Sequence, residues 1–204
     1  GASELEMTMW NCALFQDEQK AKWIGEDAGE NMQALRMLSG NMQEFAKGLA
    51  EVTGPKLNIQ WNNLWDAMLV CYTGKKSYSY HLDNPCTSDG QGLPDNGIRM
   101  TLAYFINPHW SPEGNYNGGG LDVYVSSPSE PPASLGKARK GNRIRIAPHA
   151  DTLVCFPSQR VPHQVISTSG KELWFCLWMW CFDEEVMLNF PTMVQQQWQQ
   201  AEAA

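Results

Sequence analysis

From residue 65 to residue 182 the chain is a series of short, strand-like runs separated by clusters of turn residues. The runs cover residues 65–72, 78–82, 99–107, 120–125, 144–146, 152–156, 163–166 and 173–182. Gly, Pro, Asn and Asp divide them, and strands of this length and spacing are typical of sandwich and barrel folds. About eight such strands predict a double-sheet jelly roll with helices on one outer face, an α+β fold that is mainly β.

A different period precedes the strands. Within residues 28–50, apolar side chains recur at spacings of three and four, at Met32, Leu35, Leu38, Met42, Phe45 and Leu49. This pattern predicts an amphipathic helix that packs its apolar side against a core. Gly54 and Pro55 are expected to end the helical region.

The length of 204 residues fits a single domain. We expect helical support over about residues 1–55, a jelly-roll core over about 60–185 and a tail over 186–204. The Gln-rich end of the tail, from residue 191, is predicted to be helical. The loops 84–98 and 108–119 are long and rich in turn residues, so they are candidate lids.

Charge and hydropathy exclude two classes of partner. The formal net charge of −7 argues against a nucleic-acid partner, which needs a basic face. The densest basic stretch, residues 137–145, is interpreted as a solvated turn leading into a strand, with a functional basic patch as the alternative. No apolar run reaches the roughly 18–20 residues that span a bilayer, so no membrane partner is expected.

The six Cys residues form no CxxC pair, and several lie inside apolar runs, where Cys behaves as a small hydrophobic residue. The pattern favours the cytoplasm or another reducing compartment, although an even number of Cys leaves disulfides open. No signal peptide is visible, and the sequence leaves a removed targeting segment open.

A candidate metal site begins with His81 and Asp83. Residues two apart on a strand project from the same face, so both side chains can reach one ion. His163, on a distant strand, is a suitable third ligand. Two imidazoles and one carboxylate on one face suit non-haem Fe(II), because they leave positions open for a chelating co-substrate and oxygen.

The His-x-Asp pattern alone is weak evidence, because it arises by chance and a strand-end His can simply hydrogen-bond to the Asp. The chain even repeats the pattern at His149 and Asp151, in a turn that opens a strand. That second pair lies too close to His163 in sequence to return from a separate strand, and we expect no metal role for it. His109, in a Pro-His-Trp loop, is treated in the same way.

The surroundings of the first pair carry more information. They include AMLVCYTGKKSYSYHLDNP (67–85), IRMTLAYFINPHW (98–110), GGGLDVY (118–124), DTLVCFPSQRVPHQV (151–165) and WMWCFDEE (178–185). In this series the chain resembles the prolyl 4-hydroxylase branch of the 2-oxoglutarate/Fe(II)-dependent dioxygenases, and among them the hypoxia-inducible-factor prolyl hydroxylases. The resemblance runs in register from about residue 30 to residue 185.

The resemblance implies a role for individual residues. It matches the three iron ligands to His81, Asp83 and His163. It also implies two other sets: the co-substrate contacts Tyr72, Thr101, Tyr104 and Lys171, and the substrate contacts Asn84, Arg99 and Trp110.

Two co-substrate positions depart from the family pattern. Phe105 stands where the family usually has a Tyr, so either that contact is lost or a bulge turns Tyr104 inward. The distal carboxylate of 2-oxoglutarate needs a buried cation, because an unpaired buried charge is costly. Lys171 is the expected cation, yet alignment of the Trp-rich end places Trp174 at that position, and Arg145 and Arg160 are the remaining alternatives.

The activity that the resemblance implies is hydroxylation of a prolyl residue in a protein or peptide, with release of succinate and CO2. Fe(II), 2-oxoglutarate and O2 would be required, with ascorbate as reductant. Two alternatives remain open: the same chemistry on a non-proline substrate, and a jelly-roll binding module without catalysis.

Overall fold

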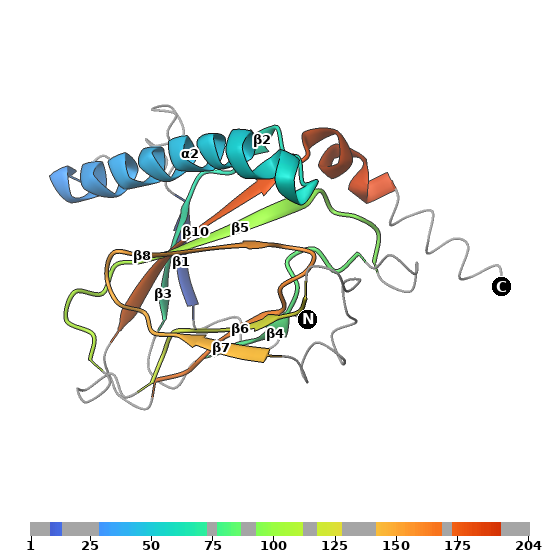
Figure 1. The fold of residues 1–204 in the computed structure, drawn as a ribbon. Coiled ribbons are helices and arrows are strands. Elements are labelled where there is room, and N and C mark those ends of the chain that lie inside the picture. Colours follow the sequence, from blue (N-terminus) through green and yellow to red (C-terminus); the bar gives the residue numbers. More distant parts are fainter. Residues whose placement is uncertain are drawn as a thin grey trace.

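Two antiparallel sheets lie one above the other, and a long helix crosses the outer face of the larger one (Figure 1). The computed structural model describes residues 33–72, 77–86, 93–111, 118–127, 142–168 and 173–192, together with the backbone of residues 9–13 and 29–32.

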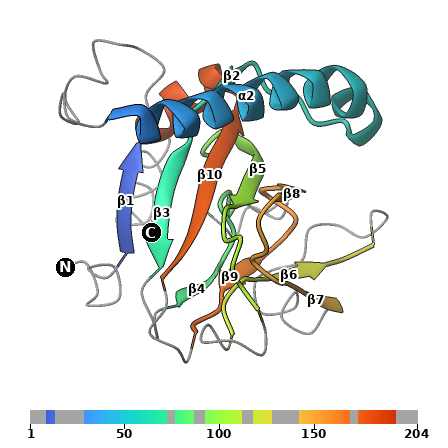
Figure 2. The same ribbon diagram turned by 90° about the vertical axis from the view of Figure 1, so that its left-hand side faces the viewer.

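The larger sheet has six strands and the smaller sheet four. The larger has the order β1-β3-β10-β5-β8, with β2 also paired to β10, and Figure 2 shows these strands side by side under the helix. The smaller has the order β4-β9-β6-β7. Their bounds are β1 Met9–Ala13, β2 Asn63–Leu64, β3 Met68–Tyr72, β4 Tyr78–His81, β5 Ile98–Phe105, β6 Leu121–Val125, β7 Asn142–Ile146, β8 Thr152–Pro157, β9 His163–Val165 and β10 Trp174–Phe182.

Strand β10 is buried on both faces, which explains its almost unbroken apolar sequence. Because side chains alternate along a strand, Trp174 and Trp178 face the core between the two sheets. Leu177 and Met179 face the opposite way, into a second core beneath the helix. One strand therefore joins both cores, and the metal-ligand candidates border the first of them.

The helix α2 spans Gly29–Leu57 and packs Met42 and Ala46 against the outer face of the larger sheet. It runs past Gly54 and Pro55, where the sequence predicted its end. The reason is a cap at Asn58, which adopts the left-handed conformation (φ 53°). The N–H of Ile59 then donates to the carbonyl of Gly54 at 3.0 Å, and the helix ends there.

The expected jelly roll is confirmed: all eight predicted strands are present, with ends shifted by a few residues. The expectation of helical support over residues 1–55 is wrong at residues 9–13, which form strand β1 and pair with β3. A five-residue strand with a ready pairing partner needs no helical period of its own.

The segment 184–192 is helical, so helix begins earlier than the predicted position 191, and the remainder of the tail lies outside the described residues. Each candidate lid lies partly outside the described residues. Of the basic stretch 137–145, only residues 142–145 are described. None of the described helices is long and apolar enough to span a bilayer.

Candidate metal centre

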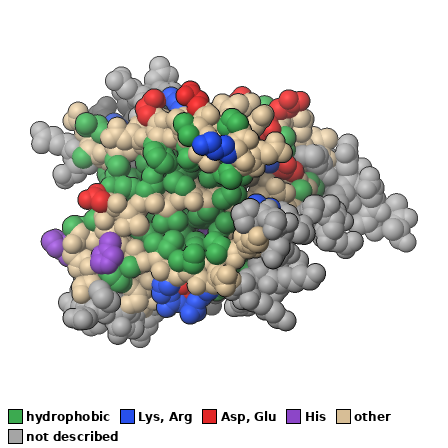
Figure 3. Space-filling view, viewed as in Figure 1, with side chains coloured by type: hydrophobic (Ala, Val, Ile, Leu, Met, Phe, Trp, Pro, Cys, Tyr) green, Lys and Arg blue, Asp and Glu red, His purple; other side chains and the backbone are tan. Residues whose placement is uncertain are grey.

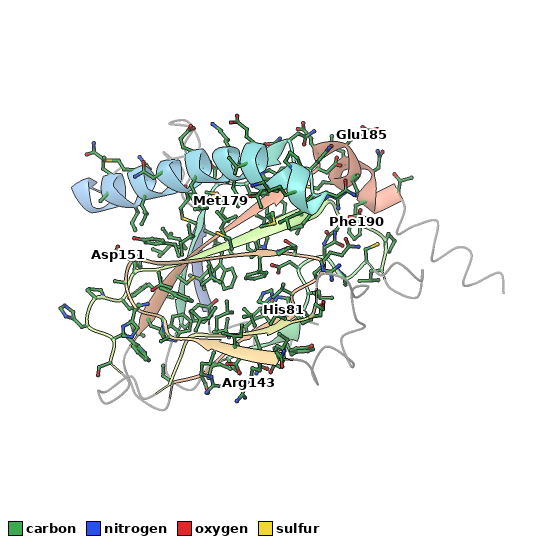
Figure 4. All side chains as sticks on the ribbon, in the orientation of Figure 1. His81, Arg143, Asp151, Met179, Glu185 and Phe190 are labelled. Carbon is green, nitrogen blue, oxygen red and sulfur yellow. The ribbon has the colours of Figure 1, made fainter. Side chains whose placement is uncertain are left out.

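His81, Asp83 and His163 come together between the two sheets. One ligand atom from each lies within 4.8 Å of the other two, and no other group of three or more such residues exists in the described part of the chain. His81 ends β4 and His163 begins β9, and these two residues are direct partners across the antiparallel pair. Figure 4 shows His81 in the space between the sheets.

Backbone carbonyls orient both imidazole rings. Nδ1 of His81 lies 2.7 Å from the carbonyl oxygen of Ser79, and Nδ1 of His163 lies 3.3 Å from that of Val161. A proton on each Nδ1 leaves the Nε2 lone pair free, and both Nε2 atoms face Asp83, at 3.3 and 3.8 Å. The orientation is the one that a metal-binding His requires.

A hydrogen bond from a threonine hydroxyl fixes the carboxylate of Asp83. Thr101, which is fully buried on β5, donates to Oδ2 of Asp83 at 2.5 Å, and its oxygen lies 2.8 Å from the Ser158 hydroxyl. Burial alone would raise the pKa of Asp83, but the neighbouring His81 and His163 rings and the hydrogen bond from Thr101 hold it below its usual value. The carboxylate is therefore ionised at neutral pH.

His163 is almost completely buried, among Phe156 and Trp178. Burial lowers its pKa to about 4, although Asp83 opposes this shift. The ring is neutral at physiological pH and can donate a lone pair to a metal ion. The chemistry of the donor set, two neutral imidazoles and one carboxylate on one side, fits Fe(II).

A cavity of about 290 Å³ opens beside the three ligand candidates. Its other lining residues are Met68, Val70, Tyr72, Tyr78, Val165, Trp178 and Trp180. Apart from the metal-ligand candidates this lining is apolar and aromatic. A cavity of this size with a few polar groups at one end is a typical small-molecule site.

Of the expected co-substrate contacts that the structure describes, Tyr72 alone lines this cavity. The residue is only 3% exposed, and its hydroxyl accepts a hydrogen bond from Nε1 of Trp178 at 3.0 Å. Burial raises the pKa of Tyr72 well above its usual value, so the hydroxyl keeps its proton. Lys171 lies outside the described residues, and its contact with the co-substrate stays a prediction.

The structure contradicts the expected co-substrate contact of Tyr104. Strand β5 carries no bulge at this point, so Phe105 faces the inner core and Tyr104 faces the outer one. The hydroxyl of Tyr104 donates to Asp151 at 2.5 Å. Thr101 also lies outside the cavity lining, and its contact is with Asp83.

The residues expected to bind substrate are placed differently from the prediction. Asn84 is fully buried, and its amide donates to Asp95 and to the carbonyl of Ile98, so it fixes the loop after Asp83. Arg99 forms ion pairs with Asp95 and Asp183. Neither residue lines the cavity.

Trp110 lies at the other end of β5, where its indole donates to the carbonyl of Gly118 and its ring meets that of His149 edge-on. The sequence predicted it in the substrate cleft, but the chain leaves β5 away from the metal-ligand candidates. Arg145 donates to Asp122 on the outer side of the smaller sheet, and Arg160 donates to the carbonyl of Ser127. Both alternatives for the carboxylate clamp are therefore wrong.

Several residues of the site have no counterpart in the sequence prediction, among them Ser158 and two Trp residues of β10. Ser158 supports Thr101, and Trp178 and Trp180 line the cavity. The alternation along β10 could have identified the two Trp side chains, because both lie in register with the inward-facing Trp174.

Comparisons with solved structures agree with this geometry. The fold is similar to a prolyl hydroxylase from Trichoplax adhaerens in complex with a hypoxia-inducible-factor peptide fragment, with a TM-score of 0.57, 22% identity and 79% of this chain covered. This chain spans 61% of that protein. It is also similar to a prolyl-4-hydroxylase from Pseudomonas putida, with a TM-score of 0.54, 17% identity, and 86% and 92% of the two chains covered.

A third similar structure is the viral collagen prolyl hydroxylase of Paramecium Bursaria Chlorella virus-1, with a TM-score of 0.51, 12% identity, and 86% and 96% of the two chains covered. Comparison with curated protein sequences gives no match. The family model of the 2OG-Fe(II) oxygenase superfamily matches residues 67–180, more than half of the chain, and this stretch contains all three metal-ligand candidates. The chain therefore belongs to the 2OG-Fe(II) oxygenase superfamily: it is a 2-oxoglutarate-dependent dioxygenase with a prolyl hydroxylase-like fold.

Proposed function

We propose that the protein hydroxylates prolyl residues in peptides, with Fe(II) bound by His81, Asp83 and His163. The observation that carries the proposal is the position of these three residues at one end of an aromatic-walled cavity. Fe(II), when bound together with 2-oxoglutarate and O2, supplies the oxidation that inserts one oxygen atom into a C–H bond, with succinate and CO2 as the other products.

The contribution of the chain is to position the reactants and to exclude water. The backbone carbonyls of Ser79 and Val161 fix the two imidazoles, and Thr101 fixes the carboxylate. Because these groups are set before any ligand binds, little reorganisation is needed on binding. The Tyr72 hydroxyl, fixed by Trp178, is a donor available to a co-substrate in the cavity.

The aromatic wall favours a prolyl ring as the substrate group. Trp178 lies 5.8 Å from His163 between ring centroids, and Trp180 stacks on Trp178 at 6.5 Å. Trp65, which is 42% exposed, contacts Trp180 at 5.7 Å. A continuous aromatic row thus joins the metal-ligand candidates to the surface, and a neutral ring that has no side-chain charge packs well on such a surface. The prolyl hydroxylase-like fold supports the same choice.

The test is a panel of proline-containing peptides, each paired with a copy in which Ala replaces Pro. The protein is incubated with Fe(II), 2-oxoglutarate, O2 and ascorbate, which we propose as the reductant, and the peptides are sequenced by mass spectrometry. We expect the mass of one oxygen atom on proline, together with an equal amount of succinate. The His81→Ala variant should form neither product, and His149→Ala should form both.

A second candidate is the same chemistry on a substrate other than proline. It would be identified by succinate formation in the presence of cell extract or small molecules, without oxidation of proline in any peptide. Absence of succinate under every condition would contradict both candidates.

A further inference from the structure

The cavity beside the metal-ligand candidates has no cationic side chain among its described lining residues. The described Arg and Lys side chains all lie elsewhere: Arg36, Lys47 and Lys56 on α2, Arg99 between Asp95 and Asp183, Arg143 and Arg145 at Asp122, and Arg160 at Ser127. Arg143, labelled in Figure 4, lies on the outer side of the smaller sheet, and Figure 3 shows basic side chains gathered at that edge of the molecule.

This lack of a cation matters because 2-oxoglutarate carries two carboxylates. Fe(II) with Asp83 has one net positive charge, which the C1 carboxylate of the oxo acid neutralises. The C5 carboxylate would then find no counter-charge among the described lining residues, which are otherwise apolar and aromatic. Burial of a carboxylate under these conditions is unfavourable, whereas burial of an uncharged tail of the same shape is not.

Strand β10 contributes no basic side chain to the cavity, and an indole ring packs behind Tyr72 instead. Trp174 is 1% exposed, and its ring stacks on the Tyr72 ring with centroids 4.2 Å apart and planes inclined by 20°. Trp174 belongs to the inward-facing series of β10, yet it does not line the cavity, because Tyr72 lies between. The strand position that could supply a basic side chain is thus occupied by an indole.

The Tyr72 hydroxyl is a neutral donor in the cavity lining, which also contains Tyr78 and Trp180. It accepts from Trp178, and its own proton has no acceptor among the described residues. One neutral donor can satisfy a carboxylate oxygen, a carbonyl oxygen or a water molecule, and so it discriminates weakly between a charged and an uncharged tail.

We propose that the stacked pair of Tyr72 and Trp174 determines co-substrate selectivity, and that the enzyme accepts 2-oxo acids with an uncharged apolar tail about as well as 2-oxoglutarate. The proposal rests on the iron site proposed above but not on proline as the substrate. It concerns the binding of the oxo acid, so it is tested without any peptide.

The experiment measures binding of two oxo acids to the full chain loaded with Mn(II), by titration calorimetry without peptide. The probes are 2-oxoglutarate and 5-methyl-2-oxohexanoate, in which an isopropyl group replaces the distal carboxylate. We expect dissociation constants within about tenfold of each other, whereas a buried cation would favour 2-oxoglutarate by more than about a hundredfold. A preference of that larger size in the wild-type protein would overturn the proposal, and so would failure of both oxo acids to bind.

Two variants locate the determinant. Trp174→Arg should tighten the binding of 2-oxoglutarate by about tenfold or more and leave the uncharged probe weaker or unchanged, because it places a positive charge directly behind the Tyr72 ring that lines the cavity. Lys171→Ala tests the cation that the family resemblance implies. If this variant lost affinity for 2-oxoglutarate and kept that for the uncharged probe, Lys171 would be the clamp and the proposal would be wrong.

Folding of each variant is checked by circular dichroism and thermal unfolding. If Trp174→Arg does not fold, the wild-type ratio and Lys171→Ala still decide the question. Hydroxylation of proline is a separate measurement, so a failure of the proposed function leaves these binding results interpretable.

Discussion

The chain contains two His-x-Asp sequences, and the fold uses them in different ways. His81 and Asp83 lie between the two sheets, where His163 from the neighbouring strand completes a group of three. His149 and Asp151 lie in the turn before β8, both exposed, with Asp151 in a left-handed conformation (φ 61°). Figure 4 shows His81 and Asp151 at opposite ends of the strands.

The difference lies in the neighbouring strand. His163 is the direct cross-strand partner of His81, so the pairing of β4 with β9 brings the third ligand into reach. Around His149 the nearest ring is that of Trp110, and Asp151 accepts a hydrogen bond from Tyr104. A two-residue pattern therefore becomes a metal site only where strand pairing supplies a further ligand.

Removal of a ligand should separate the two patterns most strongly. We expect His81→Ala to lower the affinity for Fe(II) or Mn(II) by more than about a hundredfold, because changes outside the ligand set already cost about 10–100-fold. The matched variant His149→Ala should bind metal as the wild type does. Calorimetric titration of the apo-protein measures both, and loss of binding in His149→Ala would show that His149 is a metal ligand.

In each pair a hydroxyl group donates a hydrogen bond to the Asp carboxylate: Thr101 to Asp83, and Tyr104 to Asp151. Thr101→Val removes the donor to Asp83, and we expect metal affinity to fall by about 10–100-fold. Thr101→Ser should retain most of it. Tyr104→Phe, which removes the donor to Asp151, should leave metal affinity unchanged. Equal affinities in Thr101→Val and the wild type would exclude a positioning role for Thr101.

Two buried Asn residues fix the loops at the two ends. The Asn107 amide donates to the carbonyls of Pro148 and Phe175, and Asn84 fixes the loop after Asp83. Ala at either position leaves buried polar groups unpaired, so each should lower the free energy of unfolding by about 1–3 kcal/mol in urea titrations. Metal affinity should fall only in Asn84→Ala. A loss in Asn107→Ala as well would mean that the two ends are coupled.

The smallest effect concerns the Tyr104–Asp151 hydrogen bond at the exposed turn. This bond raises the pKa of Tyr104 to about 12. Asp151→Asn should return the pKa toward the ordinary value of about 10, as read from tyrosinate absorbance. Because the folded-state pKa is raised, the bond stabilises the fold below about pH 10 and this contribution is lost as the pH rises toward 12. An unchanged titration curve would argue against the bond.

The strands and the metal-ligand triad could be predicted because both depend on local patterns. Alternating side chains place His81 and Asp83 on one face, and turn residues delimit β4 and β9. The residues around the triad could not be predicted in the same way. Whether Tyr104 or Phe105 faces inward depends on the register of β5 against β10, which only the folded sheets define.

Residues that matched the family pattern at the sequence level also proved to have structural partners. Asn84 and Arg99 follow the ligands closely in sequence, yet Asp95 binds both of them and keeps them out of the cavity. Strand β1 was missed because its pairing partner, β3, is separated from it by the whole of α2. Contacts of this kind depend on the fold rather than on the local sequence.

The place of β10 in the larger sheet has a consequence for folding during synthesis. Of the described strands this one is synthesised last, yet it pairs with β3 on one side and β5 on the other. Until residue 182 has emerged, both of those strands have an unpaired edge, and the wall that carries Trp178 is absent. The nascent chain therefore cannot complete its sheet or its cavity before synthesis has passed β10, and in that interval it depends on slow, long-range pairing and is exposed to aggregation.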